Sequence, residues 1–137
     1  MTNWLSGMRL TSDRMNDATL KTSTTTGATA SAGFTLVSFS GRKVNGITTI
    51  RVTCTKNGTV SEGATNTGNI ADTPMATLPV GWRPPEVIEC IWNNGFNDGG
   101  ATIGTNGVIT LRTTSGNTAL GDTTAPSVNA TWISENA

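Results

Sequence analysis

One stretch of the chain, GITTIRVTCTKNG, alternates strictly between apolar and polar side chains. Ile50, Val52 and Cys54 fall on one side of an extended backbone, and Arg51 and Thr53 fall on the other, because successive side chains of a strand point to opposite faces. Threonine is abundant along the chain, and tyrosine and histidine are absent. β-Branched residues favour pleated strands over helices, so the chain is predicted to be all-β.

Turn signals separate the alternating stretches at short intervals. The Asn45-Gly46 and Asn57-Gly58 pairs supply residues that tolerate a positive φ, as tight hairpins require. Asn106 and Gly107 mark the turn of a further hairpin between two short strands. Strands at this spacing predict an antiparallel β-sandwich or jelly roll.

The stretch EVIECIW is predicted to be the central strand. Ile88, Cys90 and Trp92 would lie on one face, and Val87 and Ile91 on the other. Apolar side chains on both faces are typical of a strand that is covered on both sides.

Three prolines and a tryptophan precede this strand in ATLPVGWRPP, residues 76–85. Each proline fixes φ, removes a backbone donor and drives the preceding residue into extended geometry. Gly81 supplies the freedom for a turn between them. The stretch is therefore predicted to be a rigid corner, with Leu78 and Trp82 available to plug the core. Trp82 could instead join a subunit contact or stack on a sugar.

The first 32 residues differ in composition from the rest. Residues 21–32 carry no large apolar side chain and are interpreted as a linker or a solvated extended segment. We therefore expect an N-terminal arm and linker over residues 1–32 and a β-sandwich domain over residues 33–137. The arm has apolar anchors but no core of its own, so we expect it to attach to another protein. These anchors are Trp4, Leu5, Met8, Leu10 and Met15.

Charge and hydropathy patterning exclude several partners. Nine Lys and Arg balance nine Asp and Glu, so no net field attracts nucleic acid or an anionic membrane. A chain of zero net charge is poorly protected against self-association, so we expect the protein to be a component of an assembly. No run of 18 apolar residues occurs, and the N-terminus lacks the zones of a signal peptide. We expect a product made in the cytoplasm.

The usual catalytic inventory is missing. Without histidine a Ser or Cys nucleophile has no imidazole base, and no paired carboxylates stand out. We therefore expect no enzyme activity and no catalytic residues. Cys54 and Cys90 lie in apolar strand-like runs and are interpreted as reduced, buried thiols. Two cysteines without histidine would lack metal ligands, so neither a metal nor a cofactor is predicted.

Three polar, glycine-rich loops remain, over residues 61–73, 93–100 and 115–125. Oxygen atoms in NNGFNDGGA could bind calcium, but one carboxylate is too little charge and the EF-hand spacing is absent, which favours a simple turn. Such loops are suited to hydrogen bonding with surface glycans. The candidate receptor contacts are Asn93, Asn94, Asn97 and Asp98.

Several of these stretches together resemble a module in tail-fibre and other virion proteins of tailed bacteriophages. They are ATLPVGWRPPEVIECI, ATIGTNGVITLRTT and VNATWI; in the module an LP.G.RP corner precedes a strand, a G...I..NG.I.L hairpin and a final strand with an aromatic residue. The start, NWLSGMRLTSDRMND, is similar to the opening of small tail-associated proteins of actinobacterial phages. The two resemblances cover roughly half of the chain. The sequence departs from the commoner corner at Trp82, where Tyr or Phe is usual, and at Pro85, where a small polar residue is usual.

The resemblance brings no catalytic residues and implies structural roles only. These fall on Leu78, Pro79, Gly81, Trp82, Arg83 and Pro84 at the corner, and on Asn106 and Gly107 at the hairpin turn.

The resemblance implies a bacteriophage virion structural protein. In the leading version it is a homotrimeric tail-fibre or tail-tip module that attaches to other virion proteins by its arm and contacts the host surface through its loops. A capsid decoration protein is the first alternative. A free carbohydrate-binding module, with Trp82 as its stacking platform, is the second.

Overall fold

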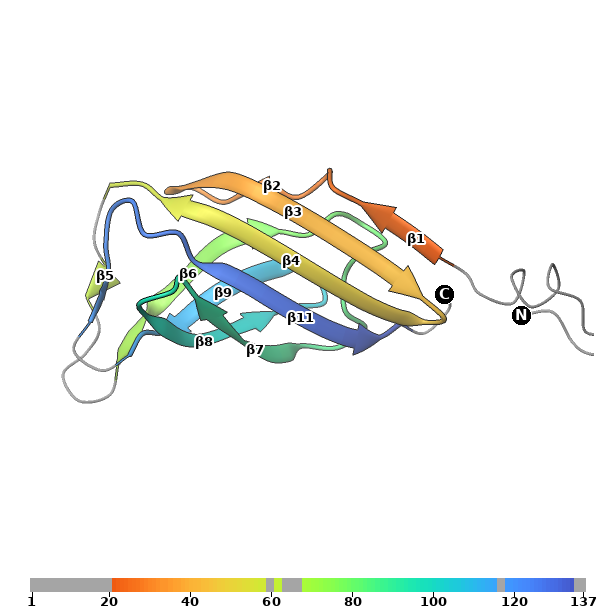
Figure 1. Ribbon diagram of the computed structural model, residues 1–137. Helices are drawn as coiled ribbons and strands as arrows, with labels where there is room; N and C mark the ends of the chain where they lie inside the picture. The colour runs from red at the N-terminus through yellow and green to blue at the C-terminus, as the bar shows by residue number, and fades with distance from the viewer. Residues whose placement is uncertain (1–20, 59–60, 63–67, 116–117, 135–137) are drawn as a thin grey trace, which may run out of the picture.

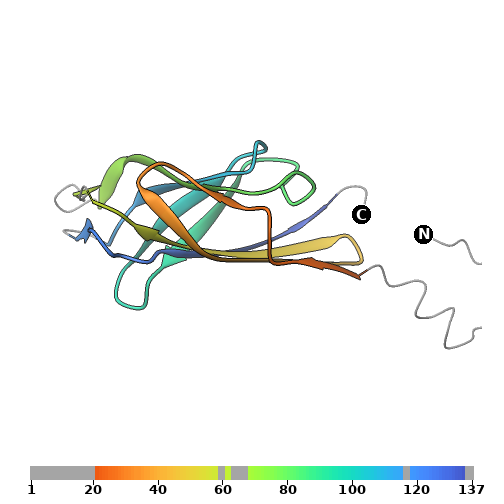
Figure 2. The ribbon, with the colours of Figure 1, turned by 90° about the horizontal axis from the view of Figure 1, so that it is seen from above.

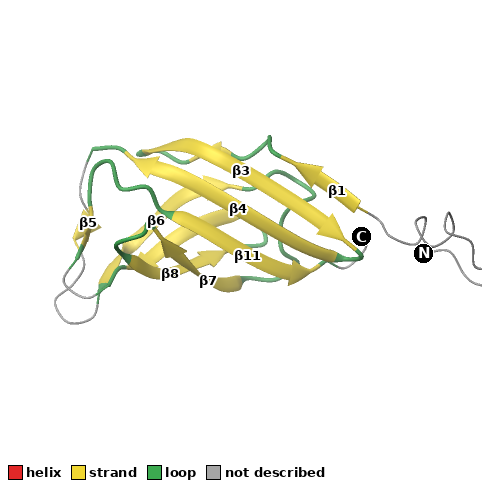
Figure 3. Ribbon diagram, viewed as in Figure 1, coloured by secondary structure: helices red, strands yellow, loops and turns green. Residues whose placement is uncertain are grey.

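The computed structural model describes residues 21–58, 61–62, 68–115 and 118–134. Every element in these residues is a β-strand or a loop, and none of them is helical (Figure 3). All the strand pairings are antiparallel. The prediction of an all-β fold is confirmed, whereas the predicted arm anchors lie outside the described residues.

Strand lengths vary from two residues to eleven, and the longest strands form a hairpin early in the described chain. In chain order the strands are β1 (Lys21–Thr24), β2 (Thr29–Ala30), β3 (Phe34–Val44), β4 (Ile47–Lys56), β5 (Ser61–Glu62), β6 (Asn69–Thr77), β7 (Ile88–Asn93), β8 (Asp98–Ile103), β9 (Val108–Thr113), β10 (Ala119–Leu120) and β11 (Ser127–Ile133).

Nine strands form one curled sheet in the order β1-β3-β4-β11-β7-β8-β9-β6-β2, and β10 pairs with β5 in a small second sheet. The large sheet folds over into two layers, one with β3, β4 and β11 and the other with β6, β8 and β9 (Figures 1 and 2). The Ser31 amide donates to the Met75 carbonyl at 3.0 Å, which fastens the end of β2 to β6. The arrangement is consistent with the predicted sandwich or jelly roll.

The core lies between the two layers. Ile50, Val52 and Cys54 of β4 are buried, as the alternation predicted, and so are the inward side chains of β11. The facing layer contributes Ile103 and Leu111, neither of which is exposed to solvent. Full burial of each such side chain contributes roughly 1.5–3 kcal/mol, so the alternating strands supply most of the drive to fold.

Two of the predicted hairpins form, at Asn45-Gly46 between β3 and β4 and at Asn106-Gly107 between β8 and β9, and one does not. Val44 pairs with Ile47 around Asn45 and Gly46, whose φ values are 49° and 79°, as a type I′ turn requires. The predicted tight hairpin at Asn57-Gly58 is wrong, because β4 pairs only with β3 and β11. Gly58 has a φ of 74°, but there the chain leaves the large sheet toward β5.

β7 occupies the middle of the strand order, yet only one of its faces is covered. Trp92 is fully buried, whereas Val87, just before the strand, and Ile91 are 62% and 66% exposed, so the prediction of burial on both sides is wrong. β7 pairs with β11 at only two positions, Ser127 with Asn93 and Val128 with Trp92. Beyond them the two strands are not paired, and a groove lined by residues 88–91 of β7 and 129–131 of β11 lies between them.

Part of the segment interpreted as a linker belongs to the sheet. β1 pairs with β3 from Lys21 opposite Val44 to Thr24 opposite Gly41, and β2 pairs with β6. The side chains of β1 are mostly exposed, which explains why the segment lacks large apolar residues. Of the two interpretations of residues 21–32, the solvated extended segment is therefore closer than the linker. The segment is also hydrogen-bonded at the sheet edge.

Candidate functional site

The proline-rich stretch forms a corner at one end of the sandwich. The Trp82 amide donates to the Pro79 carbonyl at 3.1 Å, and Gly81 has a φ of 87°. A positive φ at the third position of such a turn is the mark of type II geometry and favours glycine. Pro84 is buried and Leu78 is fully buried, so the corner is anchored in the core on both sides of the turn.

The corner contacts the β8–β9 hairpin turn, although the two segments lie well apart in the sequence. The Leu78 amide donates to the Gly107 carbonyl at 2.9 Å, and Arg83 Nε donates to the Leu78 carbonyl at 3.0 Å. A Cβ atom at position 107 would lie 2.9 Å from the Leu78 carbonyl oxygen. The corner and the hairpin turn are therefore joined by a hydrogen bond, and we call the two together the corner end.

Trp82 packs against the core at this end. The ring lies so close to Gly41 of β3 that a Cβ atom there would sit 2.6 Å from a ring carbon. Lys43 Nζ is 5.0 Å from the ring centroid, and it donates to the Gly81 carbonyl. A cation over an aromatic face is attractive. The half-buried ring thus closes the space between the layers, and this contact leaves the sugar-platform role of Trp82 without structural support.

The opposite end gathers parts of all three predicted polar loops (Figure 1). Ser115 Oγ donates to Asp98 Oδ1 at 2.6 Å, and Thr118 Oγ1 donates to Asn97 Oδ1 at 3.1 Å. The Thr114 amide donates to the Gly68 carbonyl at 2.7 Å. We call this region the loop end. The predicted loops were too long, because each range includes strand residues. β6 begins at residue 69, β8 begins at residue 98, and β10 lies within residues 115–125.

The β7–β8 loop at this end is built by its own asparagines. Asn93 Oδ1 accepts from the Gly95 amide at 2.7 Å. Asn94 Oδ1 accepts from the amides of Phe96 at 2.9 Å and Asn97 at 2.7 Å. Such side-chain bonds replace backbone bonds in Asx turns. Of the four predicted receptor contacts, Asn93 and Asn94 therefore use their side-chain oxygens to hold the loop's own backbone, whereas Asn97 and Asp98 accept from Thr118 and Ser115.

Phe96 stands at the tip of this loop, and its side chain is fully exposed to solvent. It is the one large apolar side chain between Asn93 and Asp98. Phe96 was not among the predicted contacts, although a lone phenylalanine among Asn, Gly and Asp residues was the available signal. Aromatic side chains are enriched at the centres of binding surfaces, so Phe96 is the main candidate contact of the loop end.

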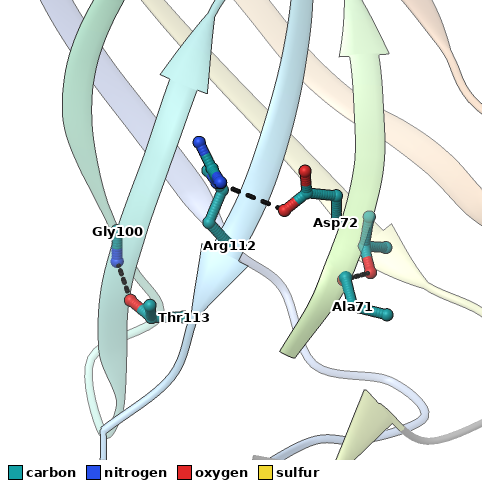
Figure 4. Close-up of polar contacts among 6 residues, drawn as sticks. Ala71, Asp72, Gly100, Arg112 and Thr113 are labelled. Carbon is teal, nitrogen blue, oxygen red and sulfur yellow. Dashed lines mark hydrogen bonds and ion pairs between the residues drawn. The ribbon is translucent and has the colours of Figure 1, made fainter. Parts of the chain in front are cut away.

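The base of the loop rests on the end of β9. Trp92 Nε1 donates to the Thr113 carbonyl at 2.8 Å. The Gly100 amide donates to Thr113 Oγ1 at 2.6 Å (Figure 4). A Cβ atom on Gly99 would overlap that carbonyl oxygen, so only glycine fits there. These contacts hold the hairpin that carries Phe96 firmly against the sheet.

An ion pair lies beside this base on the outer face. Arg112 Nε is 3.2 Å from Asp72 Oδ1 and joins β9 to β6 (Figure 4). Both side chains are exposed to solvent, and such surface pairs contribute at most about 1 kcal/mol. Thr73 Oγ1 donates to the Ala71 carbonyl at 2.7 Å in the same irregular part of β6. The outer surface of β6 near Asp72 is thus held by one ion pair to β9 and one hydrogen bond within β6.

The described residues hold no cluster of metal ligands, and their two cysteines are free. No group of three or more His, Cys, Asp or Glu side chains gathers among them to hold a metal ion. Cys54 and Cys90 are free, and burial raises the pKa of each thiol to about 11. Both thiols are therefore protonated at neutral pH and are weak nucleophiles. No helix within the described ranges is long and apolar enough to cross a membrane.

The chain matches no known protein family in a scan against family models, and a search of curated proteins finds none that is similar in sequence.

Proposed function

We propose that this chain is a structural protein of a bacteriophage virion, a homotrimeric tail-fibre or tail-tip module whose work is binding rather than chemistry. The proposal starts from the phage-like corner and hairpin stretches of the sequence. In the fold these two stretches contact each other through Leu78 and Gly107. A shared contact gives the two motifs one structural purpose, which supports treating them as parts of one module.

The observation that carries the proposal is the opposite placement of the chain entry and the polar loops. Lys21 pairs with Val44 beside the β3–β4 turn, and Lys43 contacts the corner, so the described chain begins at the corner end. The loops lie at the far end (Figure 1). A segment preceding Lys21 that binds the particle would therefore point the loop end, and Phe96, outward to the host.

Exposed apolar side chains support an oligomer. Ile47 and Ile133 are register partners on the outer face, 50% and 76% exposed. Ile91 is exposed and lines the groove between β7 and β11, and Val87, just before β7, is also exposed. A strand at the edge of a sheet has unpaired backbone groups that can pair with a strand of another chain. In addition, a chain of zero net charge does not repel its own copies at long range. A second copy would cover these side chains.

Mass measurement in solution and particle incorporation test the proposal together. We expect the full chain to have the mass of a trimer, and a variant without residues 1–20 to lose incorporation into phage particles while its β-sheet circular dichroism is retained. A matched control removes only the three C-terminal residues. A monomeric full chain, or unchanged incorporation of the deletion variant, would overturn the proposal. Incorporation on the head rather than the tail would select the capsid decoration alternative.

A further inference from the structure

We propose that the β7–β8 loop is a sugar-binding element, in which the Phe96 ring stacks on the apolar face of a neutral sugar and neighbouring asparagine amides donate to its oxygens. The inference rests on the proposed function, because it names the ligand of the loop end. It needs three properties of the loop: an available ring, a fixed backbone and hydrogen-bonding groups whose directions are set.

The ring is available and the backbone beneath it is fixed. Phe96 is fully exposed, while its own amide is held by Asn94 Oδ1 at 2.9 Å. The loop closes with a bond from the Asn94 amide to the Asn97 carbonyl at 3.0 Å. Thr118 and Ser115 brace it from the side through Asn97 and Asp98. A ligand would therefore order little of the protein on binding, which lowers the entropic cost.

The asparagine amides are oriented by bonds on their oxygen side only. The Oδ1 atoms of Asn93, Asn94 and Asn97 each accept from the protein. Their Nδ2 groups have no partner among the residues that the structure describes, and each carries two donors. Because a carboxamide is planar, fixing the oxygen also limits where the nitrogen can point. Donors with set directions suit acceptors such as sugar hydroxyl, ring and N-acetyl oxygens.

The charges around the loop favour a neutral ligand. Within residues 93–98 the only charged residue is Asp98, whose carboxylate accepts a hydrogen bond from the Ser115 hydroxyl. Arg112, the only cation between residues 93 and 118, pairs with Asp72. Phosphate, nucleic acid and anionic lipid need clustered cations. A protein partner usually covers several adjacent apolar side chains, whereas the immediate neighbours of Phe96 are Gly95 and Asn97.

Binding to defined glycans tests the inference. The full chain would be applied to an array of immobilised bacterial surface glycans and titrated in solution with maltotetraose, cellotetraose and chitotetraose. We expect at least one ligand with a Kd of about 1 mM or tighter, with sugar ring protons shifted upfield by the aromatic face. Phe96→Ala should weaken binding about tenfold or more, Phe96→Trp should retain it, and Val80→Ala, at the exposed tip of the corner turn, should leave it unchanged.

Two results would overturn the inference: no glycan on the array or in solution bound at concentrations up to about 10 mM, or equal binding by Phe96→Ala and the parent chain. Adhesion to cells that is lost after protease treatment and kept after glycosidase treatment would also contradict it. These failures are separable from failure of the proposed function. Phe96→Ala should still form trimers and enter particles, so loss of sugar binding alone removes only the sugar.

Discussion

The two ends of the sandwich achieve rigidity by different means. At the corner end, prolines restrict the backbone, Leu78 is buried in the core, and Trp82 lies over Gly41 between the layers. At the loop end, Asn93 and Asn94 hold the backbone through side-chain oxygens, and the large apolar side chain points out into solvent. The corner end keeps the Trp82 ring half-buried against the core, whereas the loop end exposes the Phe96 ring to solvent.

The difference separates stability from binding. An apolar side chain stabilises the fold only where it leaves water, so the Leu78 and Trp82 side chains at the corner end contribute to folding. An exposed ring contributes nothing of that kind and is free to gain burial from a ligand. Substitutions at the corner end should therefore change the free energy of unfolding, and substitutions at the loop tip should change binding alone.

Leu78→Ala should have the largest effect on stability. The side chain is fully buried, and truncation of a buried leucine costs about 2–5 kcal/mol through lost burial and the cavity left behind. Urea denaturation followed by tryptophan fluorescence would measure the loss. A loss in the free energy of unfolding below about 1 kcal/mol would show that the corner contributes little to stability. The contrast between the two ends would then be wrong.

Gly107→Ala tests the contact between the corner and the hairpin. Its φ of 84° costs an L-residue about 1–2 kcal/mol, and the added Cβ would also press on the Leu78 carbonyl oxygen. Gly33→Ala is a matched control, since Gly33 has a φ of 82° and no atom near the position of a Cβ. We expect Gly107→Ala to cost about 1–3 kcal/mol more than the control. Equal losses would mean that the contact contributes nothing.

The sequence pattern predicted the core of this fold but not its edge strands or its exposed surface. Ile50, Val52 and Cys54 were predictable because burial on one face leaves a period of two. β1 carries no such signature, since an exposed edge strand is held by backbone bonds that any residue can make. The apolar run of β7 indicated two covered faces, but nothing in it specifies whether the second cover comes from the same chain.

The candidate site was harder to predict for a chemical reason. Asparagine in a glycine-rich loop can bond either a ligand or its own backbone, and the spacing does not distinguish the two. Asn93 and Asn94 bond the backbone. Phe96 carried a weaker signal, as a lone phenylalanine among Asn, Gly and Asp residues, but only the geometry of the folded loop shows that its ring is exposed.

Asn94→Ala should have a moderate effect that is confined to the loop end. It removes the acceptor for the Phe96 and Asn97 amides, and each such bond contributes about 0.5–1.5 kcal/mol net, less where water can replace the partner. We expect faster hydrogen exchange at these two amides and unchanged exchange at Leu78 and Trp82. Uniform acceleration across the sheet would contradict the independence of the two ends.

Phe96→Ala should have the smallest effect on stability, within about 0.5 kcal/mol of the parent chain. The exposed ring buries nothing within the chain, so its removal leaves the folded state and the thermal midpoint almost unchanged. Differential scanning calorimetry would measure it. A loss comparable to that of Leu78→Ala would place Phe96 in a subunit interface and would remove it from the outward face.

The most direct test of the account is cryo-electron microscopy of particles of the phage that we propose encodes this chain. The account predicts density for the sandwich at the tail, with Lys21 and the corner end toward the particle and the Phe96 loop facing solvent. Density in which the loop end is buried against other virion proteins, or particles that lack the chain altogether, would contradict it.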